Sequence, residues 1–520
     1  MTFSKINHSY IYLFGLALLV IGLPFSNFLM SVSQFVLIGN WLVEGGIKNK
    51  LRGFGNNKTA LIISSVFVIH LLGLLYTSDL NYGLEDIRKK VPLFLLPLII
   101  ATSKPLPDIW FKRLLAIFVT SVFLATIVSS FVLFGFIGDQ VIDVRQISLF
   151  ISHIRFSLMI CLSFFITVYY AFQQKGWLRV LAVLTPLWLA LFLGLMESLT
   201  GIIVLALVSF ILLVYKTLHL KSMRRKIACL ALLLLMPLSL FFYINSQVKA
   251  FYHINPVDFS GLEEFSAKGE RYIHNTTSHA VENGNYIWVY IAWDELEESW
   301  NKKSAIPFDG VDKKEQPIRY TILRFLSSKG LRKDMEGVNS LSDSEIRSIE
   351  RGIANVDYQD VFSLPDRIRQ IIWEIDACLK GENPNGHSLT MRLEFWKAAI
   401  GIIKENPLLG IGTGDVKTAF DAQYKKMNSP LNPQWRLRAH NQFLEITIAL
   451  GLIGLLFFLF SLIYPFLSFG RNIDYFYAAF FIIAVFSMFS EDTLETQAGI
   501  TFFAFFNSFF LFARQNSRMH

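Results

Sequence analysis

Long apolar segments recur along almost the whole chain, and they constrain its fold more than any other feature. A helix that crosses a bilayer needs about 20 mostly apolar residues. Of the 520 residues, 53% are hydrophobic and only 17% are charged, against about 25% charged in a soluble domain. This composition excludes a soluble globular enzyme, a disordered chain and a disulfide scaffold. Twelve helices are predicted near residues 11–31, 33–46, 59–77, 91–102, 112–137, 148–171, 178–196, 199–215, 227–244, 443–467, 475–490 and 497–513.

Lysine and arginine in the short loops predict how these helices are oriented, because cytoplasmic loops carry an excess of both. With the N-terminus inside, the inside segments hold 18 such residues and the short outside loops hold four. The four are Arg88, Lys89, Lys90 and Arg145. Lys5 precedes an apolar run without a small-residue cleavage site, which indicates a retained first helix. We therefore expect a multi-pass protein of the bacterial inner membrane with both termini cytoplasmic.

The same orientation places the long polar stretch at residues 245–440 outside, between a membrane domain at 1–244 and another at 441–520. It carries 25 Lys plus Arg and 27 Asp plus Glu. The formal charge of +8 therefore follows from membrane topology and does not indicate nucleic acid. Segments such as LSDSEIRSIERG resemble capped helices. The fold class predicted is an all-α polytopic membrane protein with a large, mostly helical periplasmic loop domain.

The last part of this stretch holds an amphipathic helix at 391–405, ended by Pro407 and expected to lie along the outer membrane boundary. The sequence GIGTGD follows it. It does not follow a strand, so a glycine-rich turn is favoured over a dinucleotide fingerprint. The chain has no Walker loop and no HExxH, and its three cysteines form no paired spacing. Nothing in it supports nucleotide hydrolysis, a metal centre or a cofactor.

Three basic side chains are candidates for chemistry. His440 lies at the external mouth of the tenth predicted helix, beside Asn441 and after Arg436 and Arg438, and imidazole is the side chain that most readily exchanges a proton near neutral pH. Arg392 opens the amphipathic helix four residues before Trp396. It could fork onto phosphate oxygens or contact lipid headgroups.

Arg155 is the third candidate, about two turns inside the sixth predicted helix. A charge at membrane depth is costly and indicates function, although an arginine this close to the surface could also snorkel. Both interpretations stay open from the sequence. In MESLTG, a helix cap at Ser198 is the simpler interpretation of the polar residues.

RLEFWKAAIGIIKENPLLGIGTGD followed by RAHNQFLEITIALGLIGLL resembles the signature of the O-antigen ligase-related family. The resemblance covers about 185–465. The intervening insert is similar to the extended loop of Bacteroidetes-type members.

The resemblance implies a membrane enzyme that moves a glycan from an undecaprenyl-diphosphate carrier to an acceptor at the periplasmic face, without metal or nucleotide. Lipid A–core is the first expected acceptor. It implies catalytic roles for Arg392 and His440, and a weaker diphosphate-binding role for Arg155. Substrate-binding candidates beside them are Trp396, Arg436, Arg438 and Asn441. Leu199 stands where many members have an arginine, so the second diphosphate ligand is open.

Two rival functions remain at this stage. The first is a related enzyme, either an O-antigen polymerase or a protein O-oligosaccharyltransferase. The second is a transporter of lipid-linked glycans. Transporters tend to bury charges near the bilayer midplane, often in two related halves, whereas the polar residues of interest here gather at the predicted outer face. The sequence therefore favours chemistry at the membrane surface.

Overall fold

The computed structural model describes residues 7–137, 147–358, 364–381 and 383–514, and its regular structure is helical apart from one short hairpin. The chain divides into two compact units, the first formed by Met1–Ser222 and Asn383–His520 and the second by Met223–Glu382. Lys5 and Arg145, which enter the charge count, lie outside the described residues.

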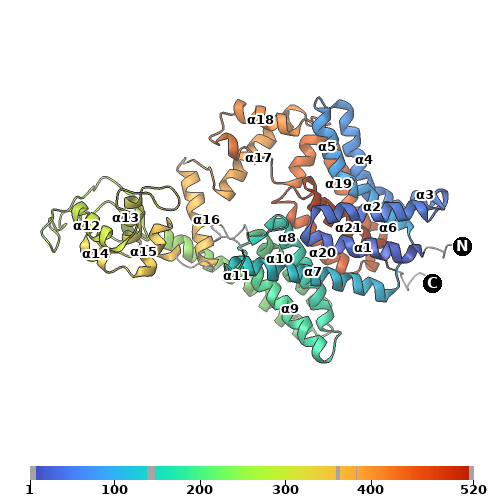
Figure 1. Cartoon of the computed structure of the whole chain (residues 1–520), viewed down its shortest axis with the longest axis horizontal. Coiled ribbons are helices and arrows are strands. Elements are labelled where there is room, and N and C mark those ends of the chain that lie inside the picture. Colours follow the sequence, from blue (N-terminus) through green and yellow to red (C-terminus); the bar gives the residue numbers. More distant parts are fainter. Residues whose placement is uncertain (1–6, 138–146, 359–363, 382, 515–520) are drawn as a thin grey trace. The chain divides into compact units, whose positions relative to one another are not determined.

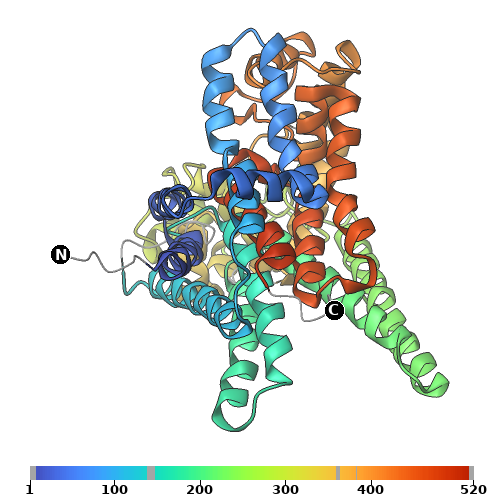
Figure 2. The ribbon, with the colours of Figure 1, turned by 90° about the vertical axis from the view of Figure 1, so that its right-hand side faces the viewer.

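The first unit is an all-helical bundle, seen from two sides in Figures 1 and 2. Its helices are α1 (His8–Phe25), α2 (Asn27–Val43), α3 (Ile47–Asn56), α4 (Lys58–Leu72), α5 (Leu80–Lys90), α6 (Pro92–Thr102), α7 (Asp108–Leu133), α8 (His153–Ala171), α9 (Gly176–Leu195), α10 (Leu199–Leu218), α17 (Ser388–Glu405), α18 (Val416–Lys426), α19 (Gln442–Phe469), α20 (Tyr475–Ser487) and α21 (Gln497–Phe512). Helix α21 is apolar on all sides and is buried along nearly its whole length, as expected for a helix in the bundle core. It packs against α6 and α20, and Phe509 stacks on Phe111 with ring centroids 4.8 Å apart.

The expectation of an all-α polytopic membrane protein agrees with these helices. Each of the twelve predicted segments contains a helix. Eight of the described helices are long and apolar enough to cross a membrane: α1, α4 with the turn after it, α7, α8, α9, α10, α19, and α11 (Met223–Phe251) of the second unit. Helices α2 and α3 form a pair bent by 111°, and α20 and α21 are shorter apolar helices. Twelve crossings therefore stay a prediction.

The second unit contains α11 and a small domain with its own hydrophobic core around Leu296, Trp300 and Ile322. The elements of this domain are β1 (Val281–Glu282), β2 (Asn285–Tyr286), α12 (Trp293–Lys303), α13 (Ile318–Ser328), α14 (Met335–Asn339) and α15 (Asp343–Glu350). Helix α16 (Leu364–Leu379) packs against α11. The capped helix expected in LSDSEIRSIERG is α15, where Ser342 and Glu345 form a capping box.

Two local expectations were wrong. Residues 80–90 were expected to be part of an external loop, but they form α5, which Asp79 caps by accepting a hydrogen bond from Tyr82 N at 3.0 Å. Together with α4 it makes a helical hairpin (Figure 2). Helix α8 begins at His153 rather than at 148, so Arg155 lies in its first turn and not about two turns inside.

The glycine-rich segment is a turn, as the sequence favours, and it fills a break in α19. At Gly451 the helix adopts a non-helical conformation. Carbonyl oxygens and amides released by the break bond to the segment before α18: Ile411 N donates to Ile448 O at 3.0 Å, and Leu452 N donates to Pro407 O at 2.8 Å. These bonds satisfy the N–H and C=O groups that the break exposes, which lipid around a membrane helix could not hydrogen-bond. They also fix the segment before α18 against α19.

Gly410→Ala is expected to destabilise the first unit by about 3 kcal/mol, from backbone strain together with a steric clash. Gly410 has a φ of +71°, and an added Cβ would lie 2.5 Å from Ile448 O. The measurement is thermal unfolding in detergent. Gly53→Ala is the matched control, because that helical glycine has open space around it and alanine favours helix. Equal melting temperatures for the two variants would contradict this account of the turn.

Candidate active site

Four separate segments of the first unit bring two arginines and one histidine onto a buried acidic pair, Glu491 and Asp492. Arg155 comes from the first turn of α8 and Arg392 from the first turns of α17. His440 immediately precedes the N-cap of α19, and the acidic pair follows α20. Arg155 lies 336 positions before Glu491 in the sequence, so only the folded bundle assembles this cluster.

The acidic pair organises the cluster through short ion pairs. Glu491 accepts from Arg155 Nη1 at 2.8 Å through Oε2 and from Arg392 Nη2 at 2.9 Å through Oε1. Asp492 accepts from Arg155 Nη2 at 3.0 Å. Charge-assisted bonds of this kind are the stronger ones in proteins. Only 1% of Glu491 is exposed, so the two guanidinium groups take the place of water around its carboxylate.

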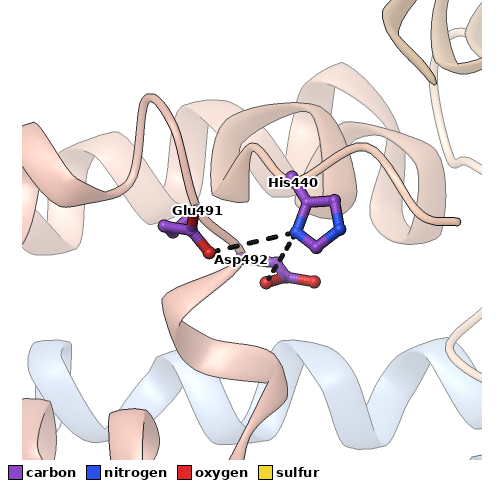
Figure 3. Close-up of side chains that lie close together, drawn as sticks. All are labelled: His440, Glu491 and Asp492. Atoms are coloured by element: carbon purple, nitrogen blue, oxygen red, sulfur yellow. Dashed lines mark ion pairs between the residues drawn. The ribbon is translucent and has the colours of Figure 1, made fainter. Parts of the chain in front are cut away.

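His440 faces the same pair with one edge of its ring. Its Nδ1 lies 3.7 Å from Asp492 Oδ1 and 3.9 Å from Glu491 Oε2 (Figure 3). These distances are too long for direct hydrogen bonds but short enough for charge attraction. The other ring nitrogen, Nε2, points away from both carboxylates (Figure 3). His440 therefore presents one ring nitrogen to the acidic pair and directs the other away from it.

The local backbone holds His440 in this position. Its φ of +46° lies in the left-handed region, which a non-glycine residue occupies only when its surroundings impose it. Asn441 caps α19 by accepting from Phe443 N and Leu444 N, and its side-chain amide donates to Phe489 O at 2.9 Å. The ring of Phe395 lies 5.7 Å from that of His440. Strain of this kind is common at functional sites.

The charges at the cluster favour an ionised Asp492. Burial raises the pKa of this carboxyl, but His440 and Arg155 lower it more, so the net pKa lies below its usual value. Asp492 therefore favours its negative form, and its Oδ1 lies 3.7 Å from Nδ1 of His440.

The other predicted binding residues mostly contact the chain itself. Trp396 Nε1 donates to Ala439 O at 3.0 Å, and Arg436 Nε donates to Leu431 O at 2.9 Å. Together with the cap at Asn441, these bonds shape the loop that carries His440. Substrate binding by Trp396, Arg436 and Asn441 stays a prediction.

Arg438 belongs to a second charge network beside the first. It donates to Glu495 at 3.0 Å and to the hydroxyl of Tyr82. Lys90 of α5 donates to Glu495 and to Asp86. Burial lowers the pKa of Lys90, but Glu495 and Asp86 raise it more, and the net pKa is raised. This network ties α5 to the loop between α20 and α21.

Glu491, Asp492 and Glu495 were not among the residues predicted from the sequence. A signal for them was present, because SEDTLETQ places three acidic residues between two strongly apolar segments at the expected external face. Charged residues beside membrane helices pair or carry function. No spacing within the sequence, however, indicates which arginine each acid contacts.

Atoms of His440, Glu491 and Asp492 lie close enough together to hold a metal ion. Both oxygens of Glu491 already accept bonds from guanidinium groups. A divalent cation there would have two positive charges beside it, and repulsion would oppose its binding. The residues therefore fit an arginine-paired acidic pair better than a metal centre.

Comparison with known proteins adds one finding. A family model described as O-antigen ligase matches residues 349–459, and no curated protein matches the chain. The matched region contains Arg392, Arg438 and His440, together with the glycine-rich turn. Arg155 and the acidic pair lie outside it. This match supports the assignment of the chain to an O-antigen ligase-related family.

Proposed function

We propose that this protein transfers a glycan from undecaprenyl diphosphate to an acceptor hydroxyl at the periplasmic face, with lipid A–core as the first acceptor. The match to the O-antigen ligase family model supports a membrane glycan ligase or polymerase in general. The observation that carries the finer proposal is the convergence of Arg392 and His440 on Glu491. A phosphate-binding group and a proton acceptor thereby lie beside each other.

The reaction that these groups serve is a displacement at the anomeric carbon. An acceptor hydroxyl forms the new glycosidic bond, and the bond from that carbon to the diphosphate oxygen breaks. The hydroxyl proton passes to Nε2 of His440, and the carrier diphosphate leaves with the bonding electron pair. Arg392 stabilises the negative charge that develops on the leaving oxygens, because it is already fixed in place. The acidic pair stabilises the imidazolium that forms.

Within the first unit, segments predicted to lie on the same side of the membrane contact one another. The start of α8, the start of α19 and the loop between α20 and α21 are all external in the predicted topology, and these three segments meet at the acidic pair. On the predicted cytoplasmic side, Arg514 pairs with Asp108 at 2.7 Å and Thr59 bonds Ser468 at 2.9 Å. The contacts are thus consistent with a site that faces the periplasm.

The position of the charged residues at helix ends also supports glycan transfer and not transport of a lipid-linked glycan. Arg155, Arg392 and His440 all lie at or near the ends of helices. A transporter would be expected to place such groups near the middle of the membrane, often at paired broken helices. A break is present at Gly451, but the glycine-rich turn fills it with backbone bonds.

A deletion strain tests the function and separates ligase from polymerase. We expect long glycans to be lost from lipid A–core while the complete glycan accumulates on the lipid carrier. Attachment of single repeat units with loss of long chains would indicate a polymerase. Loss of a glycan from envelope proteins alone would indicate a protein O-oligosaccharyltransferase. Unchanged glycans in every fraction would contradict the proposal.

A further inference from the structure

Glu491 occupies a special position because its two carboxylate oxygens serve different cations. Oε2 bonds Arg155 on α8 and Oε1 bonds Arg392 on α17. Its backbone belongs to the loop after α20. With 1% of the residue exposed, water cannot replace either partner. One side chain thus fixes the relative position of three segments.

All hydrogen bonds of the Arg155 guanidinium among the described residues go to the loop after α20. Besides Glu491, it donates to the side chain of Asp492 at 3.0 Å, to Asp492 O at 3.1 Å and to Thr496 at 3.3 Å. All three of its nitrogens have a protein partner, and 5% of the residue is exposed. A bulky diphosphate could reach this guanidinium only by breaking several buried charge-assisted bonds.

Arg392 differs from Arg155 on each of these points. Its side chain is 24% exposed, and its bond to Glu491 uses Nη2. Its Nε is buried and has no hydrogen-bond partner within the described parts of the chain, and no bond among the described residues uses its Nη1. A guanidinium carries five N–H donors in a fixed plane, so one anchored nitrogen sets the direction of the others. Arg392 therefore keeps donors for an anionic ligand, and Glu491 determines where they point.

We propose that Glu491 is a positioning residue for glycan transfer, which orients Arg392 toward the diphosphate and faces Nδ1 of His440, and that Arg155 is its permanent counter-cation and not a diphosphate ligand. This inference rests on the proposed function and assigns a separate role in it to Glu491, Arg392 and Arg155. It revises the diphosphate-binding role that the family resemblance implies for Arg155. It also accounts for a site that operates with a leucine at position 199, because Arg392 is the arginine that contacts the donor.

The proposal predicts different kinetic effects for the two residues. Glu491→Gln keeps the size of the side chain and removes its charge, so Arg392 loses its anchor and Arg155 loses a counter-charge. We expect kcat to fall at least tenfold with a change of less than threefold in the KM for donor. Glu491→Asp should recover part of the lost kcat, because the charge returns on a shorter side chain. Arg155→Lys should likewise lower kcat and leave the donor KM nearly unchanged.

The experiment uses the purified full-length chain in detergent with a short-chain polyprenyl-diphosphate glycan as donor. Rates are measured per folded protein, which is quantified by size-exclusion chromatography. Glu405→Gln is the matched control on α17, because this glutamate is exposed and pairs only with Lys426 among the described residues. We expect its kcat and KM to match those of the unmodified protein.

Three outcomes would overturn the inference. The first is a normal kcat per folded molecule in Glu491→Gln, which would show a purely structural role. The second is a tenfold rise in donor KM at unchanged kcat in Arg155→Lys, which would make Arg155 a direct ligand. The Arg155→Lys measurement tests the inference even if Glu491→Gln does not fold. The third is no recovery in Glu491→Asp. Full activity of a His440 variant in the same assay would instead remove the proposed function itself.

Discussion

His440→Asn is expected to reduce glycan transfer by about 10² to 10⁴-fold, the contribution usual for a general base. Nε2 of His440 points away from the acidic pair and is the nitrogen available to accept the hydroxyl proton (Figure 3). Asparagine offers no base. It tolerates the left-handed backbone at this position better than most residues, so the variant tests chemistry with little added strain. His440→Ala should be inactive as well, with an additional cost of about 1 kcal/mol from its backbone.

The measurement is the transfer rate of purified variants from a lipid-diphosphate donor, with membrane insertion checked by fractionation. His279→Asn is the control, because this histidine is exposed in the second unit. We expect the control to transfer normally and both His440 variants to insert normally. Full attachment of glycan in cells that carry His440→Ala would refute the role of His440.

Arg392→Ala is expected to lower kcat by about 10² to 10³-fold, as the removal of one preorganised donor does in other enzymes that stabilise negative charge. The Nη donors of Arg392 that do not bond Glu491 are the ones that remain for the departing diphosphate. Arg392→Lys should be intermediate, because lysine keeps the charge but loses the planar fork.

The control for this series is Lys404→Ala, an exposed basic residue on the same helix. Donor kinetics in detergent provide the test, and the control should retain full activity. If Arg392→Ala and Lys404→Ala lose activity to the same small extent, Arg392 is a surface charge and the proposed transition-state role is wrong.

The apolar segments were sufficient to predict the apolar helices, because a helix in a membrane must satisfy its own backbone. The candidate residues Arg392 and His440 were also found from their sequence surroundings, and the structure places both beside Glu491. Their proximity could be predicted because they flank one local motif, and because both lie near helix ends on the same predicted side.

The partners of these residues could not be predicted in the same way. Glu491 lies 99 positions from Arg392 and 336 from Arg155, and no periodicity relates such distant residues. The break at Gly451 is a tertiary feature too, since its backbone bonds go to residues around Gly410. Helix α5 was missed because its charged residues resemble a loop when only hydropathy is considered. In each case contacts between distant segments determine the structure.

The most direct test of the account is a structure of the protein with an undecaprenyl-diphosphate glycan bound. We expect phosphate oxygens within about 3 Å of the guanidinium of Arg392, the ordinary length of a charge-assisted hydrogen bond. The anomeric carbon should lie on the side of His440 that carries Nε2, and Arg155 should keep its bonds to Glu491 and Asp492. A diphosphate held elsewhere, with Arg392 and His440 both remote from the sugar, would contradict the central claim.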